Sequence, residues 1–218
     1  MEPLCRPKSI ALIGASGNRE KIGNTILGYL KDWQGKLYLV NPKEIRIDGY
    51  EVQSDVADLP DSVELAIITL GARQAVEAAK KCAEKKFHTL IIPAGGFSES
   101  DGDGILLEQE LKQHVLSQGT RILGPNTLGL FMPGTGLDTI FVEHGDRMFS
   151  HPGEVAFITQ SGSVGVEALG VSGVIGWGLR AFVGLGNRMD IGENELLEYF
   201  SHDEGTKCIA LYLSLIHI

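Results

Sequence analysis

The chain has 218 residues, of which 43% are hydrophobic and 22% are charged, and its formal net charge is −9. This composition predicts one large globular domain or two modest ones. The acidic balance argues against a nucleic-acid-binding surface, and no apolar run is long enough to span a bilayer. The cysteines at 5, 82 and 208 have no metal or redox spacing, and no histidine makes a metal pattern, so we expect a cytoplasmic protein without a metal site.

Apolar runs and amphipathic stretches alternate through the first 130 residues. Strands are predicted at 9–13, 36–40, 65–69, 89–92 and 121–123, and helices at about 22–31, 73–86 and 106–116. Short buried strands that alternate with helices favour a doubly wound parallel sheet. The sequence therefore predicts an α/β domain over residues 1–130.

The hydrophobic periodicity stops after about residue 130 and returns at residue 153. The stretch 131–152 is rich in glycine and proline and is predicted to be a linker. Residues 153–218 are predicted to form a second, partial α/β domain, with strands at 155–158, 179–183 and 208–212 and helices at 162–172 and 195–201.

A glycine-bearing turn joins the first predicted strand to the first predicted helix. Gly14, Ser16 and Gly17 lie in this turn, where backbone N–H groups at a helix N-terminus can hold an anion. The spacing departs from G-x-G-x-x-G because Ser16 stands at the second glycine position. The alternative is a tight turn that only feeds the helix.

The residues at the end of the second predicted strand help to distinguish between phosphorylated ligands. An NAD-binding domain has an acidic residue there for the ribose hydroxyls, whereas this chain has Val40-Asn41-Pro42-Lys43. A lysine suits a phosphorylated ribose, as in NADP or in the 3′-phosphate of coenzyme A (CoA). Taken alone, Lys43 is better explained as a solvated turn residue, whereas together with the glycine turn it favours a phosphate ligand.

Three further turns follow strands at the same predicted sheet edge, where ligands of such sheets bind. They are 69–71, 93–96 and 124–126, and their small residues let a ligand approach the backbone. Asn126 can hold a polar ligand group, or it can stabilise its own turn.

The second domain opens with another strand–turn–helix sequence. Ser161, Gly162 and Ser163 form a second candidate anion site, because hydroxyls here supplement the helix N-terminus. The segment 161–165 also resembles G-x-S-x-G, but a serine replaces the first glycine, and only His202 and His217 follow it. The sequence therefore disfavours a serine hydrolase.

These motifs, in this order, resemble the NDP-forming acyl-CoA synthetases, which include the α subunits of ADP-forming acetate–CoA ligase and succinyl-CoA synthetase. The segments that carry the resemblance are 9–16, 41–43, 124–129, 159–163 and 184–190. It covers nearly the whole chain. It implies a Rossmann-like CoA-binding domain followed by a partial flavodoxin-like ligase domain.

The resemblance also implies the site residues. The residues expected to bind CoA are Gly14, Ser16, Gly17, Asn18, Arg19, Lys43, Pro93, Ala94, Gly95 and Asn126. Of these, residues 16–19 would wrap the CoA phosphates, Lys43 would meet a CoA phosphate, and residues 93–95 would line the pantetheine path. Ser161, Gly162 and Ser163 would hold the phosphoryl group of a phosphohistidine in transit.

The reaction implied by the family is acid + CoA + NTP to acyl-CoA + NDP + phosphate, through an acyl phosphate and a phosphohistidine. Its cofactors would be CoA, ATP/ADP and Mg²⁺, and its substrate a small carboxylic acid. Its partner would be an ATP-grasp β portion, fused or separate, in an oligomer. No nucleic-acid or membrane partner is expected.

The sequence departs from the family pattern in three places. Thr127 stands where many relatives have cysteine, and Ser214 takes the place of an expected glutamate. The serine–histidine–threonine–glycine context of the phosphohistidine is missing. The tail 213–218 matches a translated sequencing adapter, so we expect the natural coding sequence to continue past Leu213 and this fragment to be inactive alone.

Two other functions remain open at this level. The chain could be a regulatory or acyltransferase-associated module that binds CoA without ligase chemistry. It could also be an NADP-dependent dehydrogenase, although a dehydrogenase has no evident need for the second anion site at Ser161.

Overall fold

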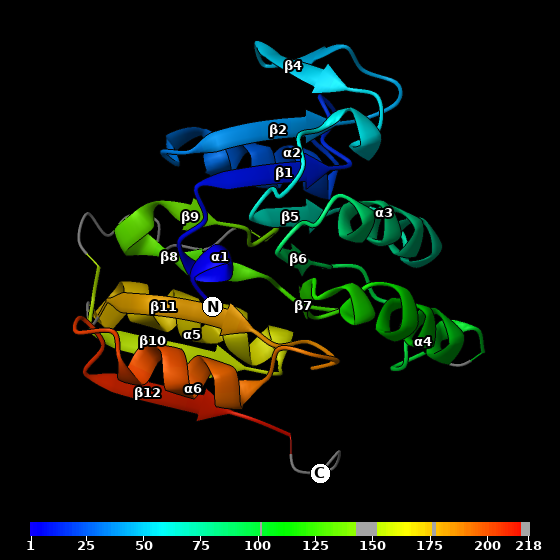
Figure 1. Ribbon diagram of the computed structural model, residues 1–218. Coiled ribbons are helices and arrows are strands. Elements are labelled where there is room, and N and C mark those ends of the chain that lie inside the picture. The colour runs from blue at the N-terminus through cyan, green and yellow to red at the C-terminus, as the bar shows by residue number, and fades with distance from the viewer. Residues whose placement is uncertain (101, 143–151, 176–177, 215–218) are drawn as a thin grey trace.

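The computed structural model describes residues 1–100, 102–142, 152–175 and 178–214, and it consists of two β-sheets with helices around them (Figure 1). The predicted strands and helices all form, with ends that differ by a few residues. Among the described residues, no helix is long and apolar enough to cross a membrane.

The first sheet contains the five predicted parallel strands and two further short strands. Its order is β3 (Arg46–Ile47), β4 (Tyr50–Gln53), β2 (Lys36–Val40), β1 (Ser9–Ile13), β5 (Leu65–Ile68), β6 (Thr89–Ile91) and β7 (Arg121–Leu123). The β3–β4 hairpin was not predicted. Its turn residues Asp48 and Gly49 have φ of 49° and 88°, as an Asp-Gly hairpin turn requires, so the dipeptide was a usable signal.

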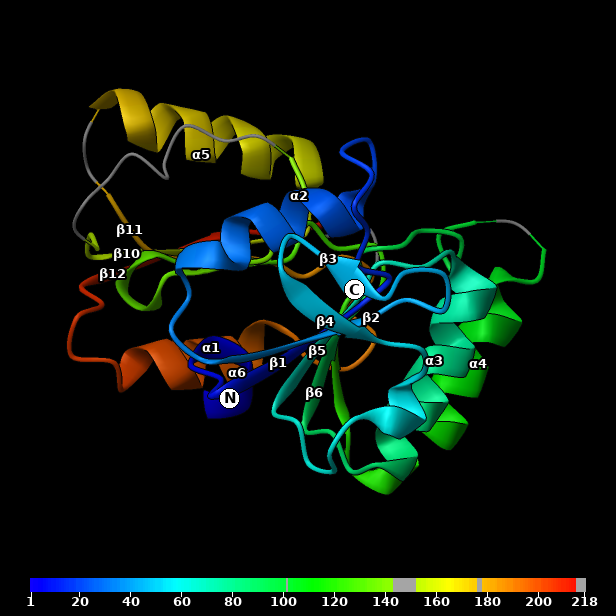
Figure 2. The same cartoon turned by 90° about the horizontal axis from the view of Figure 1, so that it is seen from above.

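Helices cover both faces of this sheet (Figure 2). On one face lies α2 (Ile22–Tyr29), and on the other lie α3 (Ala72–Glu84) and α4 (Gly104–His114). A short helix, α1 (Glu2–Cys5), precedes β1 and was also missed; it has too few residues to show a helical period. The doubly wound prediction is confirmed.

The second sheet has the order β12 (Cys208–Tyr212), β10 (Val155–Thr159), β11 (Leu179–Gly184), β8 (Leu130–Met132) and β9 (Leu137–Asp138). Helices α5 (Gly162–Ile175) and α6 (Glu193–Ser201) lie on its opposite faces (Figure 2). Strands β10, β11 and β12 are parallel, whereas β8 runs antiparallel to β11.

The prediction of an irregular linker over 131–152 is wrong for its first part. Residues 130–132 and 137–138 are strands that complete the second sheet. Both strands are too short to show alternation. Strand β8 pairs with β11, some 50 residues away, and β9 joins the sheet only through β8. Residues 143–151 of the predicted linker, and residues 215–218 of the predicted adapter tail, lie outside the described residues.

One hydrophobic core joins the two sheets. It contains Leu12 and Ile26 of the first domain together with Leu137, Val183 and Phe200 of the second sheet and its helix α6. The sheets are therefore held in a fixed relation by buried side chains as well as by the chain connection.

A cluster of ionised groups adds to this contact. Asp203 accepts hydrogen bonds from Arg180 Nε at 2.6 Å and Nη2 at 2.7 Å, and from Arg6 Nη2, near the N-terminus, at 2.9 Å. Hydrogen bonds from Arg180 lower the pKa of Asp203 to about 2. The Asp203 side chain is only 9% exposed, so solvent screens these contacts little.

We expect Asp203→Asn to destabilise the protein by about 2–3 kcal/mol at pH 7, because a shift of nearly two pKa units corresponds to about that free energy. The folded pKa lies below the unfolded value of 3.8, so this contribution is present above about pH 4 and is lost as the pH falls toward 2. Urea unfolding between pH 3 and pH 7 measures it. A matched control is Asp48→Asn in the half-exposed Lys31–Asp48 pair, which should cost less than about 1 kcal/mol. Equal losses of unfolding free energy in the two variants would contradict the stabilising role given to Asp203.

Candidate functional site

Two cavities lie along the carboxyl ends of the strands, where the sequence predicted the site. The larger has a volume of about 960 Å³ and lies at the ends of β1, β2 and β5. Among the residues that line it are Gly14, Ser16 and Lys43 from the prediction. Lys21, Arg73 and Lys81 also line it, and so do Glu20, Asp55 and Glu77. Lys81 pairs with Asp55, and Arg73 pairs with Asp103.

The turn after β1 is tightly built. Gly14 has a φ of +92°, which favours glycine, and a Cβ on Gly23 would lie 2.1 Å from the Gly14 carbonyl oxygen. The first turn of α2 therefore packs directly on the glycine turn. Asn24 Nδ2 donates to the Ser16 carbonyl at 2.8 Å, and Asn41 Nδ2 donates to the Ala15 carbonyl at 2.7 Å. These bonds fix the conformation of the turn.

A carboxylate occupies the donors of this turn. Glu44 accepts hydrogen bonds from the Ser16 hydroxyl at 3.2 Å and from the Gly17 N–H at 3.1 Å and 3.2 Å. The turn therefore binds an anionic group, and here the anion is a side chain of the same chain. Sequence reasoning missed this role, since Glu44 is 27 residues from Gly17 and only the tertiary structure brings the two together.

The smaller cavity, of about 160 Å³, lies between the two sheets. Pro93 and Asn126 line it from the first sheet, and Ser161 and Gly162 line it from the turn between β10 and α5. The structure thus brings the end of the predicted pantetheine path next to the predicted phosphoryl site. Among the described residues that line it there is no histidine, so this lining gives no support to a serine hydrolase.

The segment that follows β11 holds the two halves of this cavity together. Along the free edge of β7 and its turn, the backbone N–H groups of Asn187, Met189 and Ile191 donate to the carbonyls of Pro125, Gly124 and Ile122, at 2.8, 3.1 and 3.1 Å. The carboxylate of Asp190 accepts from Arg121 Nε and from the Ile122 N–H at 2.7 Å. The carboxyl end of the second sheet is thereby fixed against that of the first.

Glu99 and Asn187 add a side-chain contact between the halves. Asn187 Nδ2 donates to Glu99, and the Gly96 and Phe97 N–H groups donate to the same carboxylate at 2.6 and 3.2 Å. Partial burial raises the pKa of Glu99, but these hydrogen bonds outweigh it and hold the pKa below its usual value. Neither residue was predicted, because their contact depends on how the two domains dock.

The start of α5 is capped by its own hydroxyls. The Ser161 hydroxyl accepts from the Val164 N–H at 3.3 Å and lies 3.2 Å from the Ser163 hydroxyl, while the Thr159 hydroxyl accepts from the Ser161 N–H at 3.0 Å. A helix of 14 residues starts here, and its dipole favours an anion at this end.

Several predicted residues lie beside the cavities rather than in their walls. They are Gly17, Asn18, Arg19, Ala94, Gly95 and Ser163. Asn18 stabilises the glycine turn through its N–H bond to the Ser16 hydroxyl at 3.2 Å. Ala94 accepts from the Asn126 N–H at 2.9 Å, and a Cβ on Gly95 would lie 3.3 Å from Asn126 Oδ1. Arg19 is exposed, and the structure gives it no role in either cavity.

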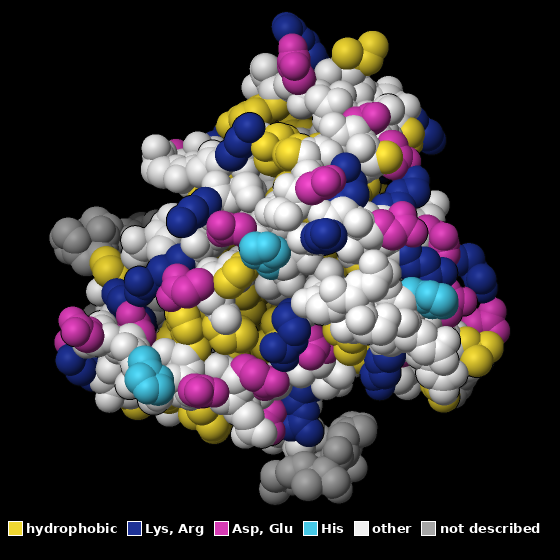
Figure 3. Space-filling model, viewed as in Figure 1, with side chains coloured by type: hydrophobic (Ala, Val, Ile, Leu, Met, Phe, Trp, Pro, Cys, Tyr) yellow, Lys and Arg dark blue, Asp and Glu magenta, His cyan; other side chains and the backbone are white. Residues whose placement is uncertain are grey.

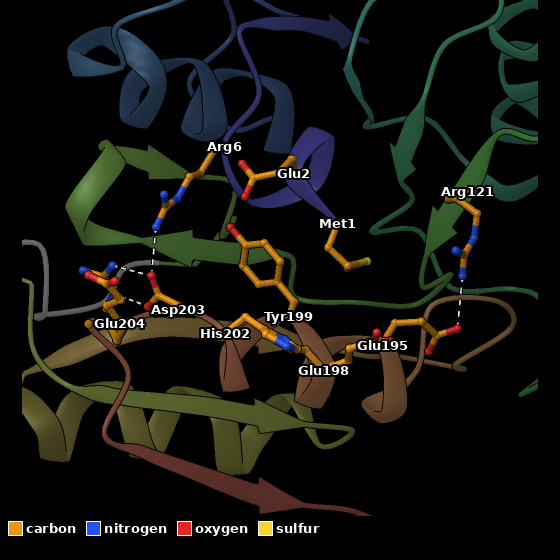
Figure 4. Close-up of a pocket in the computed structure, with 12 residues that line it drawn as sticks. Met1, Glu2, Arg6, Arg121, Glu195, Glu198, Tyr199, His202, Asp203 and Glu204 are labelled. Carbon is orange, nitrogen blue, oxygen red and sulfur yellow. Dashed lines mark hydrogen bonds and ion pairs between the residues drawn. The ribbon is translucent and has the colours of Figure 1, made fainter.

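A third cavity, of about 890 Å³, lies at the N-terminal side of the molecule between α1 and α6 (Figure 4). Arg6 and Arg180 pair with Asp203, and Arg121 pairs with Asp190 and Glu195. Its arginines are thus already neutralised by carboxylates, so this cavity does not favour an anion. On the same side of the surface, acidic and basic side chains are interspersed and form no single-sign patch (Figure 3).

The two domains match two known families. Residues 8–133 match the CoA binding domain, and residues 152–217 match the succinyl-CoA ligase-like flavodoxin domain. Within the described residues, no group of three His, Cys, Asp or Glu side chains could hold a metal ion.

Two similar proteins are archaeal acetate–CoA ligases. The chain is 36% identical to the α subunit of the ADP-forming acetate–CoA ligase I of Pyrococcus furiosus over 98% of its own length and 46% of that protein. It is 34% identical to the ADP-forming acetate–CoA ligase I of Archaeoglobus fulgidus over 98% of its length and 30% of that protein. The chain therefore spans less than half of these relatives.

Solved structures agree with these matches. The acetyl-coenzyme A synthetase 1 of Candidatus Korarchaeum cryptofilum, solved in complex with phosphate and ADP, superposes with a TM-score of 0.91 and 32% identity, over 99% of this chain and 46% of that one. A Pyrococcus horikoshii protein gives a TM-score of 0.90 and 34% identity, over 97% of this chain and 48% of that one.

We expect Asn187→Asp to lower stability by about 1 kcal/mol at pH 7, because it puts a carboxylate beside Glu99 and Glu108 and removes a hydrogen-bond donor. The neighbouring carboxylates raise the pKa of the new group in the folded state, so the loss should shrink as the pH falls through that raised pKa. Thermal unfolding from pH 7 to pH 4.5 measures this. Asn187→Ala adds no charge and only removes one of the hydrogen bonds that lower the Glu99 pKa, so its loss should change little between pH 7 and pH 5, where Glu99 stays ionised. The same pH dependence in both variants would contradict the assignment.

Proposed function

Because the chain belongs to the CoA binding domain family, and by the order of its two domains to the NDP-forming acyl-CoA synthetases, we propose that it is the CoA-binding portion of an acid–CoA ligase. The overall reaction is acid + CoA + NTP to acyl-CoA + NDP + phosphate. The observation that most supports this proposal is the 160 Å³ cavity, because predicted CoA-binding residues and predicted phosphoryl-binding residues line it together.

In this proposal CoA lies along the carboxyl edge of the first sheet. Its phosphates bind at the glycine turn and near Lys43, and its thiol end reaches Pro93 and Asn126. From β1 to β7 the sheet crosses three inter-strand spacings, about 14 Å in all, which an extended pantetheine arm can follow. Glu44 occupies the phosphate donors in the free chain, so a CoA phosphate must displace it.

The start of α5 serves the phosphoryl group. The N–H groups and the Ser161 and Ser163 hydroxyls stabilise negative charge without needing to move, which is the main contribution a protein makes to phosphoryl transfer. A carboxylate oxygen of the acid attacks phosphorus of the phosphohistidine, the P–N bond breaks, and an acyl phosphate forms. The CoA sulfur then attacks the acyl carbon, the acyl C–O bond breaks, and inorganic phosphate leaves with the thiol proton.

The remaining parts of the proposal lie beyond this chain. The phosphohistidine belongs to the rest of the enzyme, and the nucleotide site and its Mg²⁺ belong to an ATP-grasp portion that is fused or separate. The assembled enzyme is an oligomer, and its substrate is a small carboxylic acid. A cytoplasmic location fits the three cysteines, none of which forms a disulfide.

The proposal predicts that the 218-residue chain binds CoA, and that Lys43→Ala weakens the binding about tenfold through loss of one charge-assisted phosphate contact. Isothermal titration measures both. Lys207→Ala is the matched control, because Lys207 lines neither cavity and donates to the Glu204 carbonyl. NADP should compete poorly; if NADP binds more tightly than CoA, the dehydrogenase alternative is the better account.

Glu44→Gln should bind CoA several-fold more tightly than the unmodified chain. The substitution removes a negative charge from the phosphate donors and weakens the contact that the ligand must displace. Glu51→Gln, at an exposed side chain of β4, changes the net charge equally and should leave the dissociation constant unchanged. Weaker binding by Glu44→Gln would mean that Glu44 contributes to holding the ligand.

A further inference from the structure

The 160 Å³ cavity between the two sheets has an apolar wall and a polar wall. Leu128 and Phe141 supply the larger apolar side chains, and Asn126, Gln160 and Ser161 supply polar groups. If the proposed function holds, on which this inference rests, the acyl group must lie where the phosphoryl site and the CoA thiol both reach. This cavity is the space between the two, so it is where the acyl group would bind.

The volume of the cavity limits what fits. A protein cavity of about 150 Å³ accommodates a benzene molecule, whereas drug-sized ligands occupy pockets of about 300–1,000 Å³. A volume of about 160 Å³ therefore admits an acid of about six non-hydrogen atoms, such as acetate, propionate or butyrate. A phenylpropenoic acid is much too large.

The charge of the cavity limits the acid as well. Of the described residues that line it, none is acidic or basic. A dicarboxylic acid would place its second carboxylate in this space without a cationic partner, which costs far more than burying a methyl group. The lining therefore favours a monocarboxylic acid over a dicarboxylic one.

Of the two larger apolar wall residues, Phe141 is the less constrained. Leu128 is wedged against α5: a Cβ on Gly165 would lie 3.2 Å from its Cδ1, and one on Gly162 would lie 3.6 Å from its Cγ. The Thr127 hydroxyl is held by the Gly184 carbonyl at 2.5 Å. Phe141, by contrast, follows β9, is only partly buried, and packs with its ring at the margin of the core shared by the two sheets.

We propose that this cavity is the acyl site for a short monocarboxylic acid, and that Phe141 determines the largest acyl group it accepts. Replacing the Phe141 ring by a smaller side chain enlarges the cavity on its apolar side. The polar wall and the phosphoryl site at Ser161 remain unchanged.

The test uses the 218-residue chain and a series of CoA thioesters. Isothermal titration gives dissociation constants for CoA and for acetyl-, butyryl-, hexanoyl-, benzoyl- and succinyl-CoA. Acetyl- and butyryl-CoA should bind at least as tightly as CoA, and the other three at least tenfold more weakly. In Phe141→Ala, the affinity for hexanoyl- and benzoyl-CoA should rise at least fivefold, whereas the affinity for succinyl-CoA should stay low.

Two further variants are controls for a folding defect. Phe141→Leu keeps an apolar side chain of intermediate size and should give an intermediate recovery. Phe157→Ala removes a partly buried ring that stacks on Phe182 and lines neither cavity, so its thioester profile should match the unmodified chain. If CoA binds but all thioesters bind equally, or the profile is the same with and without the Phe141 ring, the acyl-site proposal is wrong. If CoA itself does not bind, the proposed function fails first.

Discussion

The docking of residues 187–191 on the edge of β7 is the contact on which the candidate site depends. An edge strand exposes unpaired backbone groups. Here the carbonyls of Ile122 in β7 and of Gly124 and Pro125 in its turn accept hydrogen bonds from the loop that follows β11, and Asp190 binds Arg121. These backbone hydrogen bonds fix the two sheets against each other, as the hydrogen bonds between neighbouring strands fix the strands within one sheet. They bring the carboxyl ends of β7 and β11 together, and with them two turns that lie far apart in sequence.

The docking of the two sheets brings together the turns that form the candidate site. The turn after β6 and the turn after β7 belong to the first domain, and the start of α5 belongs to the second, yet all three surround one small space. Near the middle of the same sheet edge, after β1, the glycine turn already holds an anion in the form of Glu44. The chain thus offers one anion site after the central strand of the first sheet and another at the start of α5, with small residues between them.

Local sequence predicted the parts of the site that depend on local physics. The buried strands show themselves as short apolar runs, and the glycine turns follow from what a strand-to-helix connection requires, so Gly14, Ser16, Ser161 and Gly162 could be identified. Glu44, Glu99, Asn187 and Phe141 could not, because each acts through a partner that only the tertiary structure supplies. Strands β8 and β9 were missed for the same reason.

The central claim is that one ligand extends along this edge from the glycine turn to the cavity between the sheets. The most direct measurement is a crystal structure of the chain with CoA. The account predicts the phosphates at Ser16 and Gly17 with Glu44 displaced, and the sulfur beside Pro93 and Asn126. A CoA molecule in the cavity between α1 and α6, or one whose thiol points away from the second sheet, would contradict it.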